Sequence, residues 1–178
     1  MITRWPRRRR ALPPQLTAAL DTEEHIEVLA DLADGKLLAA SRFGLWLVED
    51  DKATRLGWEL VAKAGLSARV LSIIAMQVVG EFADGTQVLV DDPVREYTLV
   101  GRSGLTDVVH NRIRRSVAAS RHLGYPGGGG WVVLRRVPGR DGLRRQVRLD
   151  AGTDPGAPGL AAAVGAVADD LEINPQAG

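Results

Sequence analysis

Residues 24–100 alternate short apolar segments with turn signals, and this spacing restricts the region to a mostly antiparallel β-structure. Asp34-Gly35 and Asp84-Gly85 are hairpin signals, because these residues tolerate the positive backbone dihedral angles of tight turns. The pattern predicts strands over residues 26–30, 36–41, 43–48, 55–61, 69–79, 86–90 and 95–100.

Three further segments have helical spacing. Residues 13–20 predict two helical turns, since Pro is tolerated at a helix start. Residues 105–122 repeat apolar side chains at helical intervals and predict an amphipathic helix, and residues 157–171 predict a final one. We expect the barrel core or its rim to contain Trp46 and Trp58.

The end of the chain is predicted to form a separate extension. Gly124 to Gly130 contains five glycines and is interpreted as a hinge. The segments 131–137 and 143–149 flank a five-residue turn and predict a hairpin, with Arg135 opposite Arg145 and Arg136 opposite Arg144. We expect Trp131 to anchor it. The predicted organisation is a flexible basic arm (1–12), a main domain (13–123), a hinge (124–130) and a hairpin–helix extension (131–173).

Composition excludes several classes of chemistry. The chain has no cysteine, which excludes a disulfide framework, a thiolate metal site and a cysteine nucleophile. Ser103, Asp107 and His110 share one face of the predicted helix, which is a poor geometry for a catalytic triad. We therefore expect no catalytic residues, no metal site and no cofactor, although the sequence does not exclude an enzyme. The longest apolar stretch, Val70 to Val79, is too short to span a bilayer, so we expect no integral membrane insertion and a cytoplasmic location.

The charges are divided into blocks of opposite sign, although the net charge is only +1. Residues 1–20 carry five Arg and no acid, and residues 21–100 carry 7 basic against 15 acidic residues. Residues 101–148 carry 11 Arg against two Asp, and residues 149–178 carry five acids and no base. Blocks of this size indicate either mutual neutralisation within one fold or a basic face for an acidic partner.

The basic block from 101 to 148 supplies the candidate binding face. Like charges directly across a strand pair repel each other, so paired arginines beside one turn call for an anion. That anion is either an acidic block of the same chain or an outside partner. The candidate partner-binding residues are Arg112, Arg114, Arg115, Arg135, Arg136, Arg144, Arg145 and Arg148, with possible arm contacts from Arg7, Arg8, Arg9 and Arg10.

The order of elements over residues 24–122 resembles a pleckstrin-homology-like domain, as carried by uncharacterised small actinobacterial proteins. The residues that carry this resemblance are the hairpin strands at 26–48, the segment Leu56 to Glu59 and the helix Leu105 to Val117. The resemblance implies an α+β fold with a bent, mostly antiparallel sheet or barrel closed by a helix. It also implies a binding or scaffolding role. Phosphoinositide-binding members place a basic cluster in the first hairpin loop, whereas here that loop reads Ala33-Asp34-Gly35-Lys36.

Two functions follow from the sequence. The first is a non-enzymatic cytoplasmic adaptor whose Arg-rich face contacts an acidic protein surface. The alternative is a nucleic-acid-binding protein that uses the N-terminal arginines and the 112–148 face on phosphates. The sequence leaves the oligomeric state open.

Overall fold

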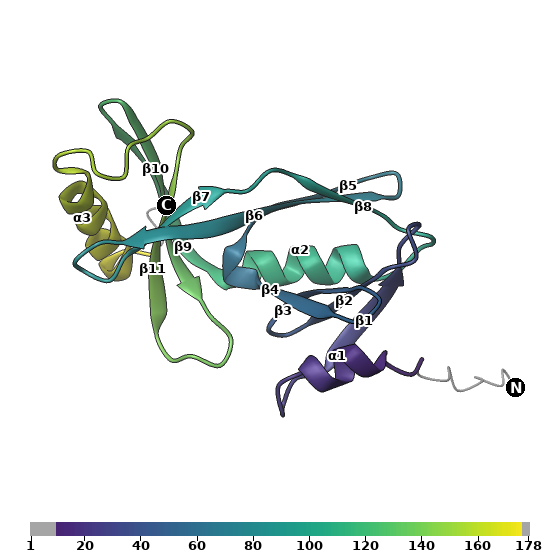
Figure 1. Ribbon diagram of the computed structural model, residues 1–178. Helices are drawn as coiled ribbons and strands as arrows, with labels where there is room; N and C mark the ends of the chain where they lie inside the picture. Colours follow the sequence, from purple (N-terminus) through teal and green to yellow (C-terminus); the bar gives the residue numbers. More distant parts are fainter. Residues whose placement is uncertain (1–9, 176–178) are drawn as a thin grey trace, which may run out of the picture.

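The computed structural model describes residues 10–175 and shows an α+β fold of mostly antiparallel strands, with a curled half-barrel sheet and a C-terminal helix (Figure 1). The elements are α1 (Pro14–Ala19), β1 (Ile26–Asp31), β2 (Leu37–Ser41), β3 (Gly44–Val48), β4 (Ala53–Gly57), the 3-10 turn η1 (Trp58–Leu60), β5 (Val61–Ser67), β6 (Val70–Glu81), β7 (Gln87–Asp91), β8 (Arg95–Thr98), α2 (Leu105–Ser116), β9 (Val117–Tyr125), β10 (Gly128–Arg136), β11 (Leu143–Leu149) and α3 (Leu160–Ile173).

The strands form two sheets, and the second sheet extends through both of the lobes defined below. The first sheet has the order β1-β2-β3-β4, and the second has the order β5-β6-β7-β11-β10-β9, with β8 paired to β6. We call β1–β5, β8 and α2 the first lobe, and β7, β9–β11 and α3 the second lobe. The long strand β6 belongs to both, because its first part pairs with β5 and β8 and its last part with β7.

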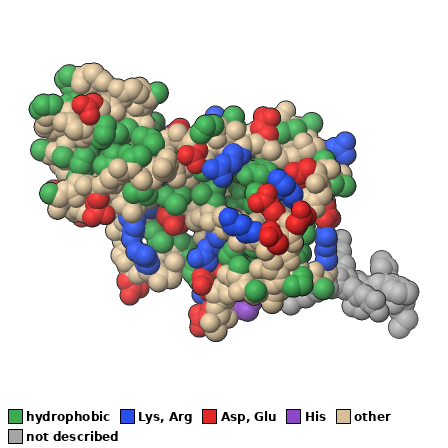
Figure 2. All heavy atoms as spheres, in the orientation of Figure 1, with side chains coloured by type: hydrophobic (Ala, Val, Ile, Leu, Met, Phe, Trp, Pro, Cys, Tyr) green, Lys and Arg blue, Asp and Glu red, His purple; other side chains and the backbone are tan. Residues whose placement is uncertain are grey.

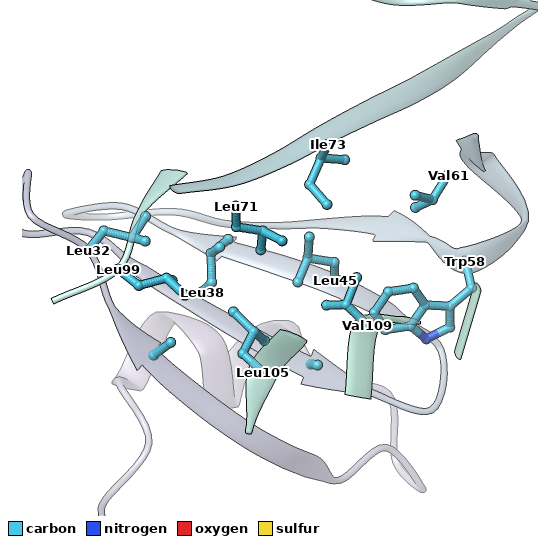
Figure 3. Close-up of a cluster of buried hydrophobic side chains, with 12 residues drawn as sticks. Leu32, Leu38, Leu45, Trp58, Val61, Leu71, Ile73, Leu99, Leu105 and Val109 are labelled. Atoms are coloured by element: carbon cyan, nitrogen blue, oxygen red, sulfur yellow. The ribbon is translucent and has the colours of Figure 1, made fainter. Parts of the chain in front are cut away.

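Each lobe has its own apolar core. In the first lobe, α2 lies between the β1–β4 sheet and the β5–β6–β8 strands (Figure 1) and inserts Leu105 and Val109 against Trp58, Leu71 and other buried side chains (Figure 3). In the second lobe, α3 covers one face of the sheet with an apolar stripe that includes Leu160, Val164 and Leu171. Burial of these faces is the main stabilising contribution for both helices.

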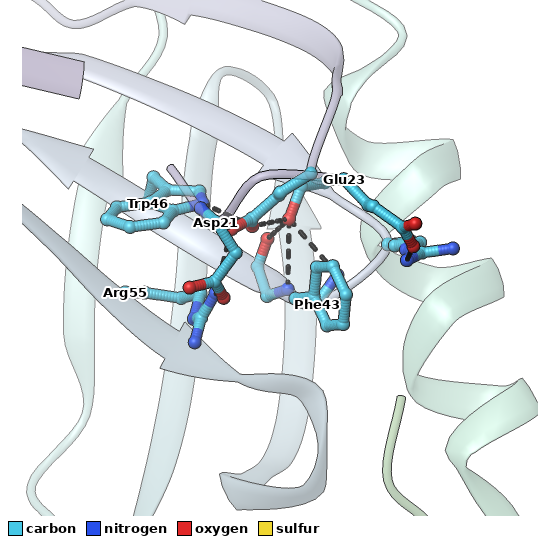
Figure 4. A network of polar contacts seen from close by, with 9 residues as sticks. Asp21, Glu23, Phe43, Trp46 and Arg55 are labelled. Atoms are coloured by element: carbon cyan, nitrogen blue, oxygen red, sulfur yellow. Dashed lines mark hydrogen bonds and ion pairs between the residues drawn. The ribbon is translucent and has the colours of Figure 1, made fainter. Parts of the chain in front are cut away.

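The buried carboxylate of Glu24 connects the segment before β1 to the first sheet, and its partners Trp46 and Arg55 are labelled in Figure 4. Glu24, only 3 % exposed, accepts hydrogen bonds from Trp46 Nε1 at 2.9 Å, from Arg55 Nη1 at 2.7 Å and from Ser41 Oγ. Arg55 also pairs with Asp21 at 2.7 Å. The segment between α1 and β1 is thereby attached to strands β2, β3 and β4.

The predicted helix over residues 105–122 is too long. Helix α2 ends at Ser116, and residues 117–125 form β9 instead. Val117 takes extended dihedral angles, and β9 pairs along its whole length with β10. A ladder formed with a strand that comes later in the chain outweighs the local helical spacing.

The predicted hinge over residues 124–130 is a tight hairpin turn. Pro126 and Gly127 connect Tyr125 to Gly128, and Gly127 has φ +80°, as a type II turn requires after Pro. Gly128 to Gly130 lie inside β10. The residues on either side are therefore neighbours in one sheet. In that sheet β11 pairs in parallel with β7, and β7 pairs with β6, the strand that continues into the first lobe.

The predicted register of the second hairpin is off by one residue. Arg135 lies opposite Arg144, and Leu134 lies opposite Arg145, because the loop comprises the six residues 137–142. A one-residue slip moves side chains to the other face of the sheet. This correction decides where each arginine of the hairpin points.

Candidate functional site

The predicted arginine face is divided between the two sides of the β10–β11 hairpin. Side chains directly opposite in an antiparallel pair share a face, and alternate positions change face. Arg135, Arg144 and Arg148 therefore lie on one side. Arg145 lies on the other side, where α3 packs.

Arg145 is neutralised within the fold. Its guanidinium donates to Glu172 of α3 at 2.8 and 2.7 Å and lies 2.8 Å from Asp169. These carboxylates, Glu172 above all, raise the pKa of Arg145 above its ordinary value. This arginine therefore holds α3, in the acidic C-terminal block, against the hairpin, and its charge is not reserved for an outside partner.

Two further members of the predicted face have partners inside the chain. Arg148 makes a bidentate contact with Asp91 of β7 at 2.6 and 2.5 Å. Arg112 of α2 pairs with Glu27 of β1. The charge blocks of the sequence thus neutralise each other in part.

The predicted basic arm is only partly described. Arg7, Arg8 and Arg9 lie outside the described residues. Arg10 pairs with Asp31 at 2.7 Å, and Leu12 packs against the core between α1 and the first sheet. The end of the predicted arm is therefore attached to the first lobe.

Five arginines line one groove, which we call the arginine groove. It lies between the C-terminal end of α2 and the β10–β11 loop and has a volume of about 300 Å³. Figure 2 shows Lys and Arg side chains on this loop and on the facing part of the first lobe. Among residues 10–175, no acidic residue lines the groove; its lining is Arg42, Trp58, Arg112, Arg115, Ser116, Arg136, Val137, Pro138, Gly139 and Arg140.

Three of these arginines have no carboxylate within 4.0 Å among residues 10–175. They are Arg115 on α2, Arg136 at the end of β10 and Arg140 in the loop. Arg136 donates to the backbone oxygens of Arg115 and Val117 at 3.4 and 3.2 Å. The end of a helix carries partial negative charge, so this contact stabilises the junction. It leaves the positive charge without a counter-ion.

Arg114 and Arg144 lie outside the groove. Arg114 is exposed and donates to Asn111 at 2.8 Å, and Arg144 is half-buried on the face opposite α3. Neither has a carboxylate partner within 4.0 Å in the part of the chain that is described.

Two arginines of the groove were not predicted from the sequence. Arg42 follows β2 and pairs with Glu23 at 3.3 Å, and its guanidinium lies 4.5 Å from the centre of the Phe43 ring. Arg42 lies in the block 21–100, which is acidic as a whole, so the charge of the block did not indicate a basic site residue there. Arg140 was not predicted because the neighbouring Asp141 offsets its charge, although its place in the hairpin turn could have indicated it.

Ser103, one member of the Ser103–Asp107–His110 pattern, makes a local contact. Ser103 Oγ accepts the backbone N–H of Leu105 at 3.4 Å, at the start of α2. Among residues 10–175, no three His, Asp or Glu side chains converge as a metal site would require. Within the same range, no helix combines the length and apolar character needed to cross a membrane.

Comparison of the chain with protein-family models, with curated proteins and with solved structures gave no match.

Proposed function

We propose that the protein is a non-enzymatic binding protein that holds an acidic segment of a partner protein in the arginine groove. One observation carries the proposal: Arg115, Arg136 and Arg140 converge on one groove from three segments, and none has a carboxylate partner within 4.0 Å among the described residues. Like charges held close together repel, so an anion from outside would stabilise the arrangement.

The lining of the groove favours carboxylates of a protein over a nucleic acid. Of the described residues in the lining, only Trp58 is aromatic, and it is 1 % exposed and offers no face for base stacking. Phosphate tracking also needs a basic stripe along the surface, whereas Glu23 and Glu27 lie beside Arg42 and Arg112. Val137 and Pro138 add apolar contacts that suit a peptide.

The proposal includes a pleckstrin-homology-like origin for the first lobe and a cytoplasmic location. The order of strands followed by α2, with the helix seated on a curled sheet, supports the first part. The absence of cysteine supports the second.

A matched pair of double variants tests the proposal. Arg115→Gln/Arg140→Gln removes two charges from the groove, and Arg69→Gln/Arg102→Gln removes two charges from elsewhere on the surface. Fluorescence anisotropy measures the binding of a labelled Asp/Glu-rich peptide to each. We expect roughly tenfold weaker binding in the groove variant and less than about twofold in the control.

The same proteins are titrated with single-stranded and duplex DNA over a range of salt concentrations. A steep fall of the binding constant with salt, together with tighter binding of DNA than of the peptide, would favour the nucleic-acid alternative. Equal losses in both double variants would show that net charge alone drives binding and would contradict a groove site.

A further inference from the structure

Arg135 is a buried arginine that has no carboxylate counter-ion among the described residues. Arg135 of β10 is 5 % exposed and donates Nη1 to Ser116 Oγ at 2.6 Å and Nη2 to the Val61 carbonyl at 3.3 Å. Its Nε–H has no hydrogen-bond partner in the described part of the chain. No carboxylate of residues 10–175 lies within 4.0 Å of its guanidinium.

Burial acts on the charge of this side chain. Burial is the largest cause that lowers the pKa of Arg135; Glu59 opposes it and Arg148 adds to it, and the resulting pKa is about 10. The group is still protonated at neutral pH. An uncompensated charge in the protein interior is unfavourable, so an anion that reached Arg135 would gain more than it would at the surface.

A second unpartnered atom belongs to a neighbour in the same sheet. Gln146 of β11 is 1 % exposed and shares a face with Arg135, since Val133 lies opposite Gln146 and Arg135 opposite Arg144. The Gln146 amide donates to Gln87 Oε1 at 3.3 Å, but its own Oε1 accepts nothing. Buried polar atoms are normally paired, so each exception calls for an explanation.

Both side chains line one cavity. It has a volume of about 120 Å³, whereas about 10–15 Å³ is enough for one water. The remaining lining is mostly apolar, and it comprises Ala62, Met76, Leu89, Val117, Ser120, Trp131, Val133 and Arg148. Trp131, expected to anchor the hairpin, is instead 43 % exposed at this cavity.

We propose that this cavity binds a small organic carboxylate that also carries a hydroxyl or amide hydrogen. Arg135 Nε and Gln146 Oε1 are both sealed from solvent in this structure. A small rotation of each side chain toward the cavity would let the carboxylate accept from Nε of Arg135 and the hydroxyl or amide donate to Oε1 of Gln146. The apolar lining would contact the carbon skeleton, as in other small-molecule sites.

The donors present argue for a carboxylate rather than inorganic phosphate. Phosphate oxygens require several donors, and Arg148, the other cation of the lining, is already held by Asp91 in a bidentate contact. One free N–H, one free acceptor and an apolar lining fit a monoanion with a short carbon chain. The site is separate from the arginine groove, because the two linings share no residue.

Sodium lactate is the test ligand, because it has a carboxylate, a hydroxyl and few atoms. Binding is followed by tryptophan fluorescence and by the melting temperature at constant ionic strength. Lactamide, propionate and inorganic phosphate serve as comparison ligands. We expect lactate to bind roughly tenfold more tightly than lactamide, with propionate in between and phosphate no tighter than lactamide.

Three variants connect the signal to the cavity. Arg135→Met removes the cation, and Gln146→Glu places a carboxylate inside the cavity; both should abolish lactate binding. Gln146→Glu should also raise the melting temperature, since it supplies the missing counter-ion. Arg144→Met, opposite Arg135 but outside the cavity lining, should bind lactate within about twofold of the wild type.

The proposal is overturned if lactate has no effect beyond that of chloride, if phosphate binds more tightly than lactate, or if binding survives in Gln146→Glu. Should Arg135→Met fail to fold, the wild-type ligand series and Gln146→Glu still decide. Loss of peptide binding in the arginine-groove variant leaves this proposal intact, because its readout uses a different ligand and different residues.

Discussion

Arg135 and Arg144 lie directly opposite each other in the β10–β11 pairing, and neither guanidinium has a carboxylate partner within 4.0 Å among residues 10–175. Their neighbour Arg145 points to the opposite side of the sheet, where Glu172 and Asp169 hold it. Two adjacent arginines of one strand therefore have opposite effects on folding: one adds repulsion and the other joins α3 to the sheet.

Substitution of each arginine by glutamine should change stability in opposite directions. Arg144→Gln should stabilise the protein by a few tenths of a kcal/mol, because it removes repulsion across the strand pair. Arg145→Gln should destabilise it by about 1–2 kcal/mol, since it removes a partly exposed, charge-assisted contact with α3. Urea unfolding of both variants measures the difference. Equal destabilisation by both changes would contradict the assigned register.

The ion pair with Arg145 also predicts a pH dependence. Arg145 lowers the pKa of Glu172 below its ordinary value of 4.5, chiefly by hydrogen bonding. A carboxyl group whose pKa is lower in the folded state stabilises the fold above its unfolded pKa. That contribution is lost as the pH falls through the lowered folded pKa. We therefore expect a decline in stability from about pH 5 to pH 3.

Unfolding curves for the wild type and for Arg145→Gln over this pH range check the assignment. The decline should be shallower in the variant. The decline in stability should not vanish in the variant, because two other carboxyl groups have lowered pKa values. Arg10 lowers the pKa of Asp31, and Arg121 lowers the pKa of Asp170. Identical slopes in the two proteins would show that Arg145 does not influence the titration of Glu172.

Much of the first lobe could be predicted from the sequence, because its signals are local. Turn residues such as Asp34-Gly35 mark strand ends between residues 26 and 98, and most of the predicted ends agree with the structure to within two residues. The exception is the strand predicted over residues 55–61: the structure has β4, the turn η1 and the unpredicted strand β5 instead. The end of α2 could not be predicted in this way. Residues 117–122 continue a helical spacing, and only pairing with β10, which comes later in the chain, makes them a strand.

The positive charge of the candidate site could be predicted from the sequence, but the positions of its side chains could not. The excess of arginine in residues 101–148 indicated a basic surface, but the register of one hairpin decides that Arg145 faces α3 and that Arg135 is buried. Register depends on loop length, and a loop of five residues is hard to distinguish from one of six by sequence. The contribution of Arg42 depends on tertiary packing alone.

Gly128 and Gly129, at the start of β10, have positive φ angles and no room for a side chain, so both positions require glycine. Gly129 has φ +151°, and an added Cβ would lie 2.3 Å from the Leu123 carbonyl oxygen. Gly129→Ala should therefore destabilise the protein by about 2 kcal/mol or more. Gly124→Ala is the control, since nothing lies within 4 Å of its Cβ position. Thermal unfolding compares them, and equal stability of the two variants would favour a flexible hinge over a paired strand.

Trp58 is a central part of the first core, as the sequence predicted, although it lies in the turn η1 and not in a strand. It is 1 % exposed and donates Nε1 to the Ser41 carbonyl at 2.9 Å. Trp58→Ala should cost about 3–5 kcal/mol of unfolding free energy. Trp131→Ala, at a half-exposed position, should cost much less. Denaturant unfolding measures both, and a reversed order would contradict the assigned core.

Glu24 and Glu23 are neighbours in the sequence with very different surroundings. The Glu24 side chain is fully buried and accepts from Ser41, Trp46 and Arg55, whereas the Glu23 side chain is 83 % exposed and touches Arg42 at 3.3 Å. Glu24→Gln loses the charge that Arg55 pairs with and leaves buried donors poorly satisfied, so it should cost about 2–3 kcal/mol.

Glu23→Gln is the matched control and should change stability by less than about 0.5 kcal/mol, because an exposed ion pair is screened by water and salt. Chemical unfolding of the two single variants and of the double variant with Arg55→Gln measures the coupling. The second change should cost less in the Glu24→Gln background than in the wild type, since the pair is already broken. Strictly additive effects of Glu24→Gln and Arg55→Gln would show that the buried carboxylate does not depend on Arg55.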